Sequence, residues 1–246
     1  MLNKHEVDIL LDEIYRGVYN THNLPPSYYI KTAKLLEDEL NKGFGETATE
    51  NQKKLYRNLR NNLYYFSAAK TYHLVNAVSA LKGEDRKTFL AKSKDIVDKF
   101  SGEYLAVEKK ATFQSTNTAK KWAKYDNRKT VPYLEYITMK DNRVRPAHVY
   151  LDGIIRRLDD SFWTTFYPPN GWLCRCKTKS TSKGENTDLR PFDMETALYD
   201  VPPLFRNNSG MSGQVFTKEH PYFKVNKDDK DLAKNNFNLP LPHQPK

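Results

Sequence analysis

Cysteine is scarce in this sequence, because its 246 residues include two, Cys174 and Cys176. Small domains that rely on disulfides carry several pairs, so a disulfide scaffold is excluded. Long apolar runs are absent as well. No uninterrupted stretch approaches the roughly 18 to 20 apolar residues that a membrane-spanning helix needs. The sequence therefore predicts a protein with no membrane span and no disulfide network.

The first residues also lack the pattern of a secretory signal. Such a signal needs a basic start and an uncharged apolar centre. Here the apolar positions of residues 2–18 are interleaved with four acids, Glu6, Asp8, Asp12 and Glu13. We therefore expect synthesis in the cytoplasm.

Apolar residues make up 38% of the chain, and the mean hydropathy is −0.80. These values predict a modest core and an extensive polar surface, in a chain long enough for one large or two small domains. Acids are outnumbered, because 30 Asp and Glu stand against 40 Lys and Arg, which gives a net charge of +10. Such a balance favours association with polyanions, DNA among them.

The positive charge is concentrated in two stretches. Between positions 109 and 129 one acid, Asp126, accompanies seven basic residues, namely Lys109, Lys110, Lys120, Lys121, Lys124, Arg128 and Lys129. A second, acid-free cluster contains Arg175, Lys177, Lys179 and Lys183. A solvated basic surface and a nucleic-acid contact both explain these stretches, and both interpretations stay open. No recognised DNA-reading motif occurs, so a DNA contact would be non-specific and strongly salt-dependent.

Helical periodicity dominates the first half of the chain. Apolar residues recur at spacings near 3.6 over residues 2–19, and an apolar stripe supports a long helix over 50–81. Further helices are expected over residues 27–42, 85–100 and 102–124. The sequence thus predicts a helical region over residues 1–130, and no catalytic pattern occurs in it.

The pattern changes at Val131, where β-branched residues, aromatics and short turns replace helical spacing. We expect a small α+β core over residues 131–190, with a strand at 134–139 and a second strand after Trp172. A short helix or turn is expected around 146–150. Beyond it, residues 191–246 hold seven of the thirteen prolines and predict an extended arm that lies along other surfaces. The expected fold class is therefore α+β.

His148, Cys174 and Cys176 are residue types that bind zinc. In a strand the two cysteines would point to the same face, because side chains alternate with period two. Both sulfurs would then share one ion with His148, and Asp141 or His220 is a candidate fourth ligand. A structural zinc would add folding free energy to a small unit with a limited core. Two other interpretations stay open, which are ordinary half-buried thiols and a local disulfide.

His148 also has the chemistry for catalysis, with Cys174 as nucleophile and Asp141 or Asp152 orienting the ring. A Cys–His pair needs an oxyanion hole, which a sequence cannot show, and a single histidine near a turn is more often structural. We therefore assign no catalytic residue. Asp141 is expected to close a turn onto its own backbone.

Residues 133–176 contain a distinctive order of polar, aromatic and turn residues. Its members are Tyr136, Thr138, Asp141, Arg143, Arg145, His148, Leu151, Asp152, Gly153, Phe162, Trp163, Pro168, Pro169, Trp172, Cys174, Arg175 and Cys176. A second patch comprises Asn207 to Gly210, Val215, Phe216 and His220 to Tyr222. This order resembles the phage Mu protein F-like (MuF) head morphogenesis proteins. The resemblance is specific over roughly residues 133–176 and implies a virion structural protein of a tailed phage or prophage.

The resemblance implies a non-enzymatic minor capsid protein that acts in head morphogenesis. Its expected partners are the portal and capsid proteins of the phage head, and packaged double-stranded DNA. Its expected location is the capsid interior or the vicinity of the portal, after assembly in the host cytoplasm. Some proteins with this domain also carry toxin domains, which leaves a nuclease or ADP-ribosyltransferase-like effector using the His148 and Cys174 region as an alternative. Residues 177–246 contain no cluster of His, Glu or Arg suited to that chemistry.

Overall fold

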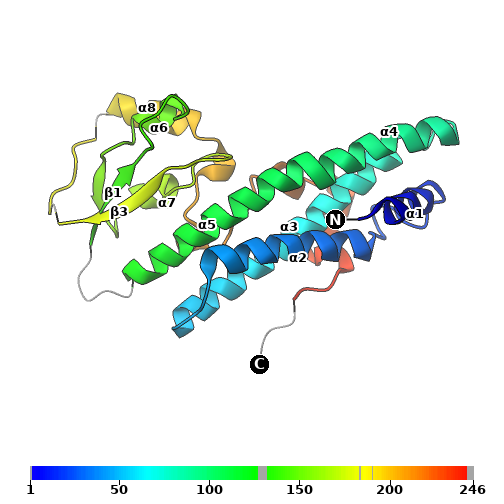
Figure 1. Cartoon of the computed structure of the whole chain (residues 1–246), viewed down its shortest axis with the longest axis horizontal. Helices are drawn as coiled ribbons and strands as arrows, with labels where there is room; N and C mark the ends of the chain where they lie inside the picture. Colours follow the sequence, from blue (N-terminus) through cyan, green and yellow to red (C-terminus); the bar gives the residue numbers. More distant parts are fainter. Residues whose placement is uncertain (1, 127–131, 183, 190, 243–246) are drawn as a thin grey trace. The chain divides into compact units, whose positions relative to one another are not determined.

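The computed structural model describes residues 2–126, 132–182, 184–189 and 191–242 (Figure 1). Its contacts divide the chain into two compact units, and each is built from segments that lie far apart in the sequence. Unit 1 contains residues 1–39, 60–109 and 218–246, whereas unit 2 contains residues 40–59 and 110–217. The domain boundaries expected near residues 130 and 190 follow changes in composition, and they stay a prediction.

Long helices form the first half of the chain, which confirms the expected helical region (Figure 1, blue to green). They are α1 (Lys4–Tyr15), α2 (Pro26–Phe44), α3 (Glu50–Ser79), α4 (Arg86–Asp98) and α5 (Leu105–Asp126), with a π-helical turn η1 (Lys99–Tyr104) before α5. Asn3 and Glu6 form a capping box at the start of α1, and the Asp85 side chain caps α4. None of the helices in the described part of the chain is long and apolar enough to cross a membrane.

The core of unit 1 joins four helices and the end of the chain. Its buried side chains come from α1, the start of α2, the second half of α3, and α4. Phe237 and Leu239 belong to the same core. The Tyr72 hydroxyl on α3 donates a hydrogen bond to Asp229. Part of the C-terminal arm therefore lies on unit 1 instead of forming a core of its own.

Unit 2 contains a three-stranded antiparallel sheet with strand order β2-β1-β3. The strands are β1 (Tyr133–Ile137), β2 (Ile155–Arg157) and β3 (Lys177–Thr181). Tyr133 at the start of β1 pairs with Arg157 on one side and with Thr181 on the other. The expected strand at 134–139 is shorter than predicted, because Lys140 has a left-handed backbone (φ 55°) and the chain turns beyond it.

Aromatic side chains fill the core of unit 2, where two short helices lie close to the sheet. These helices are α6 (Pro146–Val149), at the position where a short helix or turn was expected, and α7 (Phe162–Phe166). Trp163 and Tyr136 are fully buried, and Trp122 of α5 belongs to the same cluster. Aromatic and aliphatic side chains share this cluster about equally, and the large rings supply much of its apolar burial.

The C-terminal arm consists of short helical segments joined by extended chain. In unit 2 these are α8 (Pro191–Asp200), the 3-10 turn η2 (Pro203–Phe205) and α9 (Ser209–Ser212). In unit 1 they are η3 (Pro221–Phe223), η4 (Lys227–Asp229), α10 (Lys230–Lys234) and η5 (Asn236–Asn238). Pro203 and Pro221 stand at the first positions of η2 and η3, where a missing backbone N–H carries no cost. The chain as a whole has the α+β class that was expected.

Candidate metal centre

The structure brings together His148, Cys174 and Cys176, the three side chains predicted as metal ligands. The Nδ1 atom of His148 lies 3.7 Å from the Sγ atom of Cys174 and 3.5 Å from that of Cys176. All three ligand atoms lie within 4.8 Å of one another. His148 and Cys174 are buried and Cys176 is half-buried, so the group lies just below the surface of unit 2.

The two cysteines do not lie in a strand, which corrects the sequence prediction. Cys174 to Cys176 form the loop that leads into β3, and that strand begins at Lys177. Leu173 has a left-handed backbone (φ 58°), and the Cys174 N–H closes a turn onto the Gly171 carbonyl. The left-handed conformation is energetically unfavourable for a leucine. Residues in such conformations are frequent at functional sites, where a loop must direct several side chains toward the same ligand. Both sulfurs reach His148 through this turn instead of through strand alternation.

Backbone geometry also fixes the proton on His148. Its Nε2 atom lies 3.3 Å from the carbonyl oxygen of Asn170. A carbonyl can only accept, so Nε2 carries the ring proton and Nδ1 presents a lone pair to the two sulfurs. The Asn170 side chain is held in turn, because its amide donates to the Thr165 and Phe205 carbonyls. Histidines that bind metals are usually oriented by such a partner on the second nitrogen.

The two thiols form a coupled pair. A hydrogen bond from Cys176 lowers the pKa of Cys174, against the effect of burial. The same bond to Cys174, together with burial, raises the pKa of Cys176 well above its usual value. The two thiols therefore titrate as a pair, which loses its first proton more readily than its second.

Neither expected fourth ligand is a member of this group. The Asp141 carboxylate accepts two hydrogen bonds from Arg175, both 2.7 Å long, and these hold the pKa of Asp141 far below its usual range. Its Oδ1 atom also accepts from the Arg143 N–H, which confirms the expected turn. His220 lies in unit 1, where its ring packs edge-on against Phe66 at 4.9 Å.

The acids proposed to orient His148 in a catalytic arrangement have other partners. Asp152 accepts from the backbone N–H and the hydroxyl of Thr138, at 2.8 and 2.9 Å. Asp141 is held by Arg175, as described. The group that does orient His148 is the main-chain carbonyl of Asn170. Residue types alone cannot predict such a contact, because every residue has a carbonyl. The turn dipeptide Asn170-Gly171 is the available signal, because it marks a backbone reversal at this point.

One family model matches the part of the chain that contains this site. Residues 70–179 match the family described as Phage Mu protein F like protein. We call these matched residues the F-like region. This match begins upstream of the stretch on which the sequence resemblance is specific, and it includes all three candidate ligands.

Two curated relatives match shorter stretches of the chain. The putative capsid assembly protein F of Escherichia phage Mu is 43% identical over 58 residues, which are 24% of this chain and 13% of the relative. The Mu-like prophage FluMu F protein of Haemophilus influenzae is 46% identical over 52 residues, which are 21% of this chain and 13% of the relative. The match thus spans a small fraction of each relative's length. No solved structure matches the chain.

The seven basic residues between positions 109 and 129, which the sequence offers as a nucleic-acid contact, fall into three groups. Lys109 pairs with Glu39 at 3.4 Å, and Lys120 packs over the Phe44 ring and donates to the Glu46 carbonyl. Arg128 and Lys129 lie outside the described residues. Lys110, Lys121 and Lys124 remain, and they lie along one face of α5 because they are separated by close to whole helical turns. We call these three residues the α5 lysine face.

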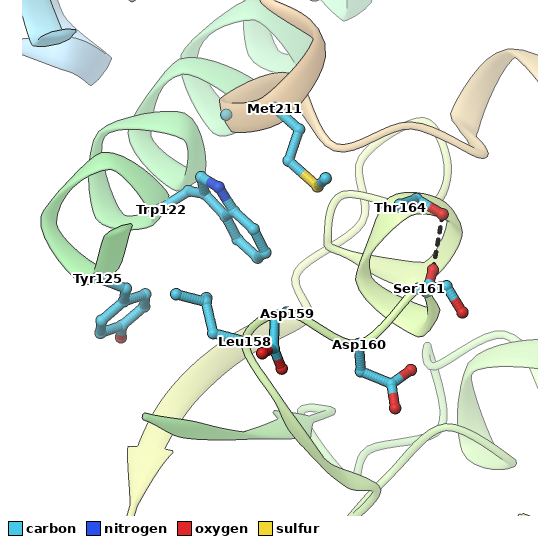
Figure 2. Close-up of a pocket in the computed structure, with 9 residues that line it drawn as sticks. Trp122, Tyr125, Leu158, Asp159, Asp160, Ser161, Thr164 and Met211 are labelled. Carbon is cyan, nitrogen blue, oxygen red and sulfur yellow. Dashed lines mark hydrogen bonds between the residues drawn. The ribbon is translucent and has the colours of Figure 1, made fainter. Parts of the chain in front are cut away.

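A pocket of about 690 Å³ lies in unit 2, away from His148 and the two cysteines (Figure 2). Figure 2 shows Trp122 and Met211 beside it, with Asp159 and Asp160 along another side. These two acids pair with Arg157 and Arg156, at 2.5 and 2.8 Å, so their charges are neutralised within the unit. Among the described residues that line the pocket we find no histidine, cysteine or cation, and we assign it no chemistry.

Proposed function

We propose that this protein acts in head morphogenesis of a tailed phage or prophage, as a non-enzymatic minor capsid protein. The observation that carries the proposal is the F-like region, together with the relative in phage Mu whose name describes capsid assembly. The capsid interior or the vicinity of the portal is the proposed location. Portal and capsid subunits are the proposed protein partners.

Packaged DNA is the proposed polyanionic partner. The net charge of +10 supports it, and the α5 lysine face offers a contact surface of matching sign. Lysine contacts to phosphates carry no base information, so binding should be independent of DNA sequence. A surface of this kind serves a protein that meets any packaged sequence.

An effector enzyme is the alternative, and one observation favours it. His148 and Cys174 do approach each other, with 3.7 Å between Nδ1 and Sγ. However, Cys174 is 4% exposed, and the same nitrogen lies closer to the second sulfur. A nucleophile needs access to its substrate, so this burial supports a structural role for the pair.

The test of the assembly proposal is a pull-down of the tagged protein from infected or induced cells. Lysates are treated with nuclease and washed at moderate salt, because a chain of this charge would otherwise recover proteins through shared DNA. The control bait is an unrelated cytoplasmic protein of similar net charge. We expect mass spectrometry to find portal and major capsid subunits with the protein alone. Recovery of host proteins only, and absence of the protein from purified particles, would contradict the proposal.

The enzyme alternative is tested on the purified chain in nuclease and ADP-ribosyl transfer assays. We expect no activity above that of a His148→Ala variant whose circular dichroism matches the parent. Activity that is lost in both His148→Ala and Cys174→Ser, with folding retained, would favour the effector instead.

A further inference from the structure

The His148, Cys174 and Cys176 cluster has the dimensions of a zinc site. Zinc–nitrogen bonds of about 2.0–2.1 Å and zinc–sulfur bonds of about 2.3 Å, at a tetrahedral angle, place nitrogen and sulfur about 3.6 Å apart. The observed Nδ1 to Sγ distances are 3.7 and 3.5 Å. We propose that these three side chains bind one zinc ion, and that a water molecule is its fourth ligand. This inference does not depend on the assembly role.

The surroundings of the cluster match what a zinc ligand set requires. His148 has its second nitrogen on the Asn170 carbonyl, so its lone pair already points at the two sulfurs. Tyr136 hydrogen-bonds to Cys176 and places its hydroxyl 3.1 Å from the Asn170 side-chain oxygen. We call the loop from Cys174 to Cys176 the ligand loop. Tyr136 thus contacts this loop from the side of the buried core.

Charge balance favours a divalent ion at this position. Two thiolates and a neutral imidazole bring the total charge of a bound Zn²⁺ to zero, so burial of the centre leaves no net charge in the interior. Soft thiolate ligands combined with imidazole select zinc over magnesium or calcium, which prefer oxygen ligands.

The fourth position opens to a small cavity of about 20 Å³ beside the ligands. That volume accommodates about one water molecule. The other residues that line the cavity are Met139, Arg143, Val144, Arg145, Leu173 and Arg175. A cavity of this size leaves room for a water ligand, and the burial of His148 and Cys174 suits a structural zinc with three protein ligands. It joins α6 to the loop that precedes β3.

The first experiment measures metal in the purified full chain, made in zinc-supplemented medium with a tag that contains no histidine. We expect one zinc per chain by mass spectrometry of the metal. Replacement by Co²⁺ should give the absorption of cobalt–thiolate bonds and of tetrahedral cobalt. Cys174→Ser and Cys176→Ser should each lose the metal, whereas His5→Gln, a change at an exposed histidine of α1, should keep it.

A second experiment needs no variant, so it holds even if the serine variants fail to fold. Removing zinc from the parent protein with a chelator should lower its melting temperature and speed alkylation of both cysteines, and added zinc should restore both values. Three results would overturn the proposal. They are parent protein without zinc that responds to neither chelator nor zinc, an intact mass lower by two hydrogens (a disulfide), and zinc retained in the Cys174→Ser/Cys176→Ser double variant.

Discussion

At the residue scale, Tyr136 connects the buried core of unit 2 to the ligand loop. Its ring is fully buried, and its hydroxyl reaches both the Asn170 side chain and Cys176. In the proposed zinc site the hydroxyl is therefore in the position of an outer partner, which would not touch the metal but would hold groups that do. Partners of this kind affect how tightly a metal binds more than whether it binds.

We predict that Tyr136→Phe weakens zinc binding by about 10-fold or more, because outer partners typically contribute that much to metal affinity. The ring and its packing are kept, so the free energy of unfolding without metal should change little. Competition with a chromogenic chelator measures the affinity. Tyr167→Phe, which removes another buried tyrosine hydroxyl of unit 2, is the matched control. Equal affinities in parent and Tyr136→Phe proteins would contradict the outer-partner role.

Lys70 and Glu108 form a buried ion pair in unit 1, between α3 and α5. Lys70 is 0% exposed and Glu108 is 3% exposed, and Nζ contacts Oε2. Burial lowers the pKa of Lys70 and raises that of Glu108, while the contact between the two groups opposes both shifts. The Tyr222 and Phe100 rings lie over the ammonium group, each at 5.9 Å.

We predict that Lys70→Met lowers the free energy of unfolding by about 3–5 kcal/mol, because a buried carboxylate then faces an uncharged side chain. The Lys70→Met/Glu108→Leu double variant should recover most of this loss, since it buries no charge. Urea unfolding of the parent, both single variants and the double variant measures the coupling. Additive losses in the double variant would show that the pair is not coupled.

At the element scale, the segment that begins with η3 attaches the C-terminal arm to unit 1. His220 caps η3, because its Nδ1 atom accepts from the Tyr222 N–H, and its ring packs against Phe66. Burial lowers the pKa of His220 from 6.5 to about 4, and the nearby Lys70 and His73 lower it in the same direction. The segment is therefore docked through a histidine that stays neutral in the folded protein.

This pKa makes the docking sensitive to acid. Between pH 6.5 and about 4 the unfolded chain binds a proton at His220 and the folded chain does not, so stability is complete above pH 6.5 and falls as the pH approaches 4. The free energy of unfolding that His220 contributes above pH 6.5, and that is lost as the pH falls to about 4, is about 3 kcal/mol. We predict that His220→Asn, which keeps an acceptor for the Tyr222 N–H, flattens the stability profile in this window. Urea unfolding at several pH values measures it, and a slope equal to that of the parent would contradict the assignment.

The elements that sequence analysis predicted well are those whose pattern repeats. The long helices follow from apolar residues spaced along one face, and their ends differ from the expected ends by a few residues. Strand β2 was not predicted, because Ile155, Arg156 and Arg157 are too few to show alternation. The Cys174 loop was predicted to be a strand. Leucine usually avoids the left-handed backbone conformation, so the sequence gives no sign that Leu173 adopts it.

The candidate site, too, could be predicted from the sequence in part. Residue types identified His148, Cys174 and Cys176, and the structure places them together. The role of the Asn170 carbonyl could not be predicted from the sequence, because every residue has a backbone carbonyl. Charge counting also treated Lys120 like its neighbours, although its ammonium group lies over Phe44 and donates to a backbone carbonyl. The three-dimensional structure decides which lysines are free of contacts within the protein and could therefore bind a partner.

At the scale of the whole molecule, the net charge of +10 favours association with polyanions. In the proposed DNA contact, the α5 lysine face would be the part of the surface that meets the phosphates. Each lysine that contacts a phosphate releases condensed counterions when DNA binds. The number of such contacts can therefore be read from the dependence of affinity on salt, separately from the total charge. Two variants with the same net charge can be told apart in this way.

We predict that a Lys110→Gln/Lys121→Gln/Lys124→Gln variant binds duplex DNA with a shallower salt dependence. The slope of log affinity against log salt should fall in magnitude by roughly 0.9 for each lysine that contacts a phosphate, or nearly 3 for all three. The matched control is Lys4→Gln/Lys87→Gln/Lys230→Gln, which removes the same charge from exposed positions of unit 1. Fluorescence anisotropy with two unrelated DNA sequences at several salt concentrations gives both slopes. Equal slopes in the two variants would mean that total charge, and not this face of α5, attracts the DNA.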